Sequence, residues 1–167
     1  MARAGPHCAG GFTLAEALLA AVVLAVAVAA VTVPFSAAAR TEQADGRRTL
    51  AVSLAREMME EILTKPFGDP QGSSDPGPEP GEVSRGLFDN IDDYDGYTEA
   101  PGGIESFDGE VIDVPEAVGL SRHVSATYVH VSGQNPGDDP TFIRVDVEVR
   151  YRGQPVVALS RLAYNLP

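Results

Sequence analysis

Glu16 is a carboxylate that stands at the start of a long apolar segment. From Ala17 to Val31 the sequence carries no polar side chain. With its flanking apolar residues, the segment is long enough to cross a bilayer as a helix of roughly 20 residues. A carboxylate at the edge of hydrocarbon is unfavourable without a partner, so Glu16 is a functional candidate. A capping box is the alternative, in which Thr13 and Glu16 bond each other's backbone N–H groups. The two roles are compatible.

A second group of carboxylates lies in the stretch FDNIDDYDGY. Clustered carboxylates on a loop can bind calcium. The candidate ligands are Asp89, Asp92, Asp93 and Asp95. An EF-hand would need an oxygen ligand at Ile91 and a glutamate at Gly102, so that motif is excluded. The alternative is a turn in which Asp and Asn bond their own backbone. Apolar side chains would then hold the loop to the core: Leu87, Phe88, Ile91 and Tyr94.

No arrangement in the sequence is typical of an enzyme. There is no nucleophile-elbow pattern and no phosphate-binding glycine pattern. We therefore expect no catalytic residues and no cofactor, apart from calcium in the acidic loop. The net charge is -12, and residues 66–119 hold fourteen acidic side chains against one basic side chain, Arg85. This distribution argues against a nucleic-acid surface, which needs clustered Lys and Arg.

The residues from Gly11 to Glu16 read GFTLAE and run directly into the apolar segment. This motif resembles the processing and methylation site of type IV prepilins and type II secretion pseudopilins. The resemblance implies that prepilin peptidase cuts between Gly11 and Phe12 and methylates the new amino terminus on Phe12. It also implies that Glu16 pairs with the amino terminus of a neighbouring subunit during assembly. Pro34 matches the family's helix proline one position late, and we expect a kink or local unwinding there.

The resemblance divides the chain into three parts. Residues 1–11 would be a leader peptide, 12–35 a transmembrane and assembly helix, and 36–167 a periplasmic pilin-like domain with an acidic loop region at 66–119. The pattern after residue 36 is that of an amphipathic helix ending before Pro66. Its apolar stripe contains Leu50, Leu54, Met58 and Ile62. Glu61 lies largely outside that stripe and is expected to pair with Lys65 four residues on.

The last third of the chain has the alternation of a β-sheet. Apolar and polar residues alternate from Ile143 to Arg152, which predicts a half-buried strand. Residues 124–131 and 156–164 predict strands on either side, with a tight turn centred on Gly153 and Gln154. The expected fold class is α+β, with one long helix packed on an antiparallel sheet of three or four strands.

These expectations favour a structural subunit over an enzyme. The chain would be a minor pilin or pseudopilin, anchored once in the bacterial inner membrane with its C-terminal domain outside the cytoplasm. Its expected partners are prepilin peptidase, other pilin or pseudopilin subunits and the inner-membrane assembly platform. The alternative is a membrane-anchored cell-surface binding module whose acidic loop holds calcium or another ligand.

Overall fold

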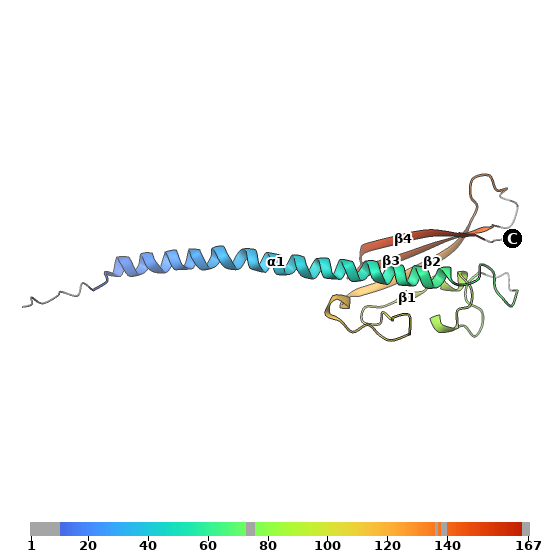
Figure 1. The fold of residues 1–167 in the computed structure, drawn as a ribbon, viewed down its shortest axis with the longest axis horizontal. Helices are drawn as coiled ribbons and strands as arrows, with labels where there is room; N and C mark the ends of the chain where they lie inside the picture. Colours follow the sequence, from blue (N-terminus) through green and yellow to red (C-terminus); the bar gives the residue numbers. More distant parts are fainter. Residues whose placement is uncertain (1–10, 73–75, 136, 138–139, 165–167) are drawn as a thin grey trace, which may run out of the picture. The chain divides into compact units, whose positions relative to one another are not determined.

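The computed structural model describes residues 11–72, 76–135, 137 and 140–164. Of the expected leader, all but Gly11 therefore lies outside the described residues. Figure 1 draws the fold as a ribbon. The elements are α1 (Leu14–Leu63), the 3₁₀ turns η1 (Arg85–Leu87), η2 (Asp92–Tyr94) and η3 (Pro115–Ala117), and the strands β1 (Thr98–Glu99), β2 (Leu120–Val129), β3 (Phe142–Tyr151) and β4 (Gln154–Tyr164).

The helix α1 contains the expected apolar segment at its N-terminal end. Alanine and leucine, the strongest helix formers, make up much of this segment. The Thr13 hydroxyl accepts a hydrogen bond from the Glu16 backbone N–H at 3.3 Å, which is one half of a capping box. At the other end, the Thr64 and Lys65 amides close the last turn, and Pro66 prevents continuation.

Pro34 lies inside α1 without interrupting it. The helical residues run continuously from Leu14 to Leu63, so α1 is not unwound at Pro34, and a kink there stays a prediction. A proline removes one backbone hydrogen bond, and the intact turns on either side keep the helix formed. Close by, the Thr32 hydroxyl donates to the Val28 carbonyl at 3.0 Å.

The chain divides into two compact units, Met1–Gln43 and Ala44–Pro167. In the first unit, the described residues are all exposed to solvent. Among the residues that the structure describes, α1 is the one helix long and apolar enough to cross a membrane. An apolar helical segment whose side chains are all exposed is unfavourable in water. Lipid or another protein that covered it would stabilise it.

The sheet is antiparallel with the strand order β1-β2-β3-β4, as a meander requires. In β3, Ile143, Val145, Val147 and Val149 are fully buried. This confirms the period-two strand. The β2 strand begins at Leu120, four residues before the expected start, and its first half pairs with the short β1. Two-residue β1 carries no pattern of its own, which is why the sequence did not predict it.

The β3–β4 turn differs by one residue from the expected turn. Gln154 belongs to β4, and the two turn residues are Arg152 and Gly153, with φ angles of 50° and 81°. Two successive left-handed residues match the twist of a two-residue hairpin. Gly153 adopts this conformation freely, whereas Arg152 adopts it at a steric cost.

The core of the second unit lies between α1 and the sheet. Figure 1 shows the strands alongside the C-terminal part of the helix. The buried helix face consists of Ala51, Leu54, Ala55, Met58, Met59 and Ile62. It packs in one apolar cluster with the buried residues of β2 and β3. The α+β class, with a helix against an antiparallel sheet, is thus confirmed.

Candidate functional site

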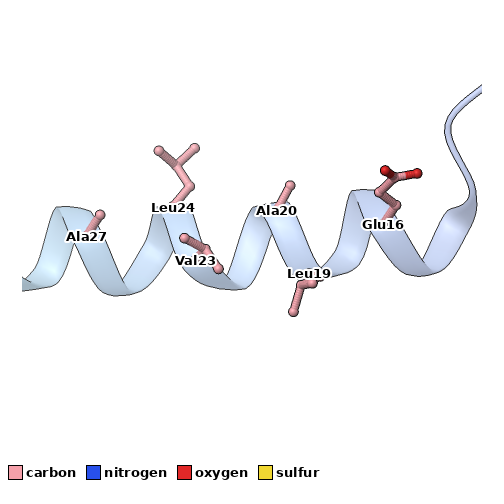
Figure 2. A pocket seen from close by; sticks show the side chains of 6 residues that line it. All are labelled: Glu16, Leu19, Ala20, Val23, Leu24 and Ala27. Atoms are coloured by element: carbon pink, nitrogen blue, oxygen red, sulfur yellow. The ribbon is translucent and has the colours of Figure 1, made fainter.

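Glu16 lies in the first turn of α1, at the end of a shallow apolar groove on the helix surface. The groove is lined by Glu16, Leu19, Ala20, Val23, Leu24 and Ala27. Figure 2 shows the carboxylate standing out from the helix, with Ala20, Leu24 and Ala27 following on the same side. This is the side-chain row that a spacing of three and four residues creates. The two alanines leave room for an incoming side chain.

The Glu16 carboxylate has no cationic partner within the described residues. None of the ion pairs found there includes it. Its backbone is tied to Thr13, but the reverse half of the capping box, from the Thr13 N–H to the Glu16 side chain, is not formed in this part of the chain. The charge is therefore available to a group from another molecule. In a low-dielectric setting such a pair is strongly attractive.

The expected processing site lies just before the helix. Gly11 and Phe12 precede the first helical residue, Leu14, and Phe12 is 82% exposed. An exposed peptide bond outside regular secondary structure is one that a peptidase can reach. The apolar residues Leu14, Leu18 and Leu19 follow it and are also exposed.

The second unit contains a buried ion network that the sequence did not predict. Glu61 of α1, Arg85 of η1, Glu99 of β1 and Arg122 of β2 alternate in charge and are all buried. Arg85 Nε donates to Glu61 Oε1 at 2.8 Å, and its second nitrogen bonds the other oxygen of Glu61. Arg122 forms a two-point pair with Glu99, and Arg85 Nη1 lies 3.4 Å from Glu99 Oε1.

Further donors and acceptors complete this network. Arg122 Nη1 donates to the Leu54 carbonyl at 3.0 Å, which ties β2 to α1. The Tyr94 hydroxyl donates to Glu61 Oε1 at 2.8 Å. Burial alone would raise the pKa of Glu61, but hydrogen bonds from Arg85 and Tyr94 outweigh it and hold the pKa below its ordinary value. Two negative and two positive charges balance one another in the core.

The expected Glu61–Lys65 pair is wrong. Glu61 turns inward to Arg85, and the Lys65 ammonium donates to the Phe88 carbonyl instead. Helix spacing placed Glu61 beside the apolar stripe, and only the position of Arg85 in the folded chain draws it inward. One sequence signal bears on this arrangement: Arg85 is the lone basic residue in a long acidic region.

The acidic loop adopts the turn proposed as the alternative to a calcium site. Asp93 Oδ2 accepts hydrogen bonds from the backbone N–H groups of Asp89 and Asn90 at 2.8 and 3.0 Å. Asn90 Oδ1 in turn accepts one from the Asp93 N–H at 3.1 Å. Phe88, Ile91 and Tyr94 are buried as expected, whereas Leu87 is exposed.

The four predicted metal ligands have separate partners. Asp89 Oδ2 accepts from Gln71 Nε2 at 2.7 Å, and Asp95 Oδ1 accepts from the Ala126 N–H at 3.0 Å. Asp92 accepts from the Gly77 N–H at 3.2 Å and from the Tyr128 hydroxyl. Asp93 alone belongs to a group of converging carboxylates, which the described residues form with Glu79 and Glu82.

The acidic loop has the opposite electrostatics from the ion network. Burial raises the pKa of Asp93, and the nearby charges of Glu82 and Asp92 raise it further. Burial also raises the pKa of Asp92 above its ordinary value, although the Gly77 and Tyr128 hydrogen bonds oppose this. The same surroundings raise the pKa of Tyr128 to about 12. Burial is the largest cause of each of these shifts, and neighbouring carboxylates add to it.

Sequence reasoning missed Glu79 and Glu82 as neighbours of Asp93. They lie in the Pro/Gly-rich stretch before η1, where no periodicity indicates which side chains turn toward the core.

Comparisons with protein-family models, with curated proteins and with solved structures found no match to this chain.

Proposed function

We propose that this chain is a pilin-like structural subunit, anchored in a membrane by the first part of α1 and assembled into a filament through it. The observation that carries the proposal is Glu16, a carboxylate without a cationic partner in the described residues. It stands at the head of the apolar part of α1, whose side chains up to Gln43 are all exposed. The preceding GFTLAE motif resembles the prepilin processing site, which supports the same assignment.

In this proposal prepilin peptidase cuts between Gly11 and Phe12 and leaves Phe12 as a methylated amino terminus. The apolar helix then passes from lipid to the helices of neighbouring subunits, which cover its exposed side chains. Glu16 receives the positively charged amino terminus of a neighbour, and that pairing sets the axial register of the incoming subunit. A charge pair inside an apolar layer sets register because any shift leaves both charges unpaired.

The proposed location is the bacterial inner membrane, with the unit from Ala44 onward outside the cytoplasm. The assembled form is a type IV pilus or a type II secretion pseudopilus. The Gly/Pro-rich loop after α1 suits a minor subunit, since it would crowd a densely repeated shaft. The other partners in this proposal are the inner-membrane assembly platform and fellow subunits.

Two measurements test the proposal. The first is the N-terminal mass of the protein recovered from membranes of cells that carry an active prepilin peptidase. We expect a chain that begins at Phe12 and carries one added methyl group. A chain that still contains Gly11 in those cells contradicts the proposal.

The second measurement is incorporation into filaments, followed by co-purification with sheared filaments. Glu16→Gln removes the charge and keeps the size of the side chain, and we expect it to abolish incorporation while the protein stays in the membrane. Glu42→Gln is the matched control, because Glu42 is also exposed on α1 but lies beyond the apolar segment. Equal incorporation of both variants would favour the membrane-anchored binding module.

A further inference from the structure

Two arginine side chains meet on the ring of Tyr151 in the unit from Ala44 onward. The Arg47 guanidinium of α1 lies 3.8 Å from the centre of this ring, and that of Arg152, in the β3–β4 turn, lies 5.1 Å from it. A guanidinium is attracted to the face of an aromatic ring, so Tyr151 helps to hold both cations in place. Two segments that are distant in the sequence thereby bring positive charge together.

The backbone around Tyr151 gives this contact its room. A Cβ atom at Gly119 would lie 3.0 Å from the Tyr151 ring, which is tighter than ordinary packing, so glycine leaves space for the ring. The Arg152 N–H donates to the Gly119 carbonyl at 2.9 Å and fixes the start of the turn. Arg152 itself has a left-handed φ of 50°, a conformation that glycine adopts more easily. The turn geometry therefore does not explain why an arginine stands there.

These two cations have no carboxylate partner. Neither Arg47 nor Arg152 takes part in any ion pair found among the described residues. The Nε atom of Arg47 is buried and has no hydrogen-bond partner in that part of the chain, which is rare for a charged donor. Glu116 packs beside α1, with its Cγ atom 3.4 Å from the position of a Cβ at Gly46, but none of those ion pairs includes it. The positive charge is therefore open to an anion from another molecule.

We propose that Arg47 and Arg152 bind the phosphate group of an anionic phospholipid. Guanidinium groups suit this ligand because their N–H donors bond phosphate oxygens in pairs. A guanidinium that stacks on a ring keeps its orientation, so less side-chain freedom is lost when the phosphate binds.

The position of the two arginines in the chain indicates a lipid. The chain enters this unit at Ala44 from the unit that holds the apolar segment, so Arg47 is one of the first cations beyond the proposed membrane anchor. Basic side chains next to a membrane-spanning segment attract anionic headgroups. The inference rests on the membrane anchoring proposed above, but it uses neither Glu16 nor the GFTLAE motif. The bound headgroup would hold this unit at the membrane surface before assembly.

The test is retention of single lipid molecules by the full chain in detergent micelles, counted by native mass spectrometry. Phosphatidylglycerol and phosphatidylcholine of equal acyl length are compared, because they differ in net charge but not in their tails. We expect the apparent affinity for phosphatidylglycerol to be at least about tenfold higher, and this preference to shrink as salt is added. Equal affinities overturn the lipid site alone. Retention of neither lipid contradicts the membrane anchoring, and the inference with it.

Variants locate the site. Arg152→Gly removes a cation and places glycine at a left-handed φ, so we expect the turn to fold as before. Arg47→Gln removes the other cation. Each variant should lower the preference for phosphatidylglycerol by about fivefold or more. Arg161→Gln is the matched control, since Arg161 is exposed and outside the described ion pairs, as Arg152 is. An equal loss in the control would indicate diffuse attraction to positive charge and overturn the site.

Inorganic phosphate separates a headgroup site from a site for the free ion. It is added to the micelles with the bound lipid and compared with chloride at the same ionic strength. We expect phosphate to displace no more phosphatidylglycerol than chloride does, because the acyl chains keep the lipid in the micelle. Displacement by phosphate at a concentration similar to that of the lipid would show a site for the free ion and overturn the lipid assignment.

Discussion

Two groups of buried carboxylates lie in the unit from Ala44 onward, and they differ in the charges around them. Glu61 and Glu99 face Arg85 and Arg122, whose guanidinium groups bond them at two points or bridge between them. Asp93 converges with Glu79 and Glu82, and Asp92 precedes it in the same turn. Both accept hydrogen bonds from backbone groups, and Asp92 also accepts one from Tyr128, but no described ion pair joins either of them to an arginine. Hydrogen bonds from Arg85 and Tyr94 lower the pKa of Glu61 in spite of its burial, whereas burial raises the pKa values of Asp92 and Asp93.

The contrast teaches that burial by itself says little about what a charge does. In the ion network the charges satisfy one another, so its role is to join α1, η1, β1 and β2. In the acidic loop, none of the ion pairs found among the described residues includes Asp92 or Asp93. A balanced group is a structural element, whereas an unbalanced one is a candidate for a ligand from outside the protein.

Removing a charge from the ion network should change the free energy of unfolding more than any change in the acidic loop. Arg122→Met should lower the free energy of unfolding by about 3–5 kcal/mol, because Glu99 loses its two-point partner inside the core. The measurement is denaturant unfolding of the full chain in mild detergent. Arg144→Met is the control, since Arg144 pairs with Asp146 at 2.9 Å but its side chain is 52% exposed.

We expect the Arg144 control to change the free energy by less than about 1 kcal/mol, as is usual for surface ion pairs. If both variants lost similar amounts of unfolding free energy, the buried ion pairs would stabilise the fold no more than an exposed pair does.

Removing a single donor should have a smaller effect. Tyr94→Phe deletes the hydroxyl that donates to Glu61 and keeps the buried ring. We expect a loss of about 1.5–3 kcal/mol, the range for hydrogen bonds to charged groups. The same unfolding assay measures it, with Tyr164→Phe as the control because Tyr164 is exposed. If Tyr94→Phe lost no more unfolding free energy than Tyr164→Phe, the Tyr94 hydroxyl would not contribute to the network.

Acid should reduce the contribution of the ion network to stability without any change in the sequence, because Glu61 becomes protonated. Because the pKa of Glu61 is below the ordinary value of 4.5 in the folded chain, its contribution to stability is complete above that pH. The contribution is lost as the pH falls through the lower folded pKa. The raised pKa values of Asp92 and Asp93 act in the opposite direction, since protonation favours their folded state.

The measurement is the melting temperature of the wild type and of Glu61→Gln between pH 7 and pH 3. The difference between the two proteins isolates Glu61, and we expect it to shrink on acidification. A difference that stays constant over that range would contradict the lowered pKa.

A charge removed from the acidic loop should have the smallest effect on the free energy of unfolding, and the effect should be of opposite sign. With a chelator present, Glu82→Gln should raise the free energy of unfolding by roughly 0.5–1 kcal/mol, because it relieves repulsion among partly exposed charges. Destabilisation by Glu82→Gln in chelator would show that the chain itself balances this group.

Local pattern determined much of this protein. The apolar segment from Ala17, the stop at Pro66 and the alternation around Val145 predicted α1 and β3, because each depends on a repeat of 3.6 or 2 residues along the chain. The candidate role of Glu16 was equally local, since a lone carboxylate beside an apolar run is visible in the residues themselves. The GFTLAE motif needs no tertiary structure to be read.

Tertiary structure decided which buried charges meet. Glu61 and Arg122 are 61 positions apart in the sequence, and Arg85 and Glu99 connect them in the folded chain. No spacing rule along the chain relates the two residues. Likewise Asp93 was predicted as a ligand, but its neighbours Glu79 and Glu82 come from an irregular loop without periodicity. Helical and strand repeats specify faces, whereas pairings between distant segments depend on how those faces pack, and only the folded chain specifies that.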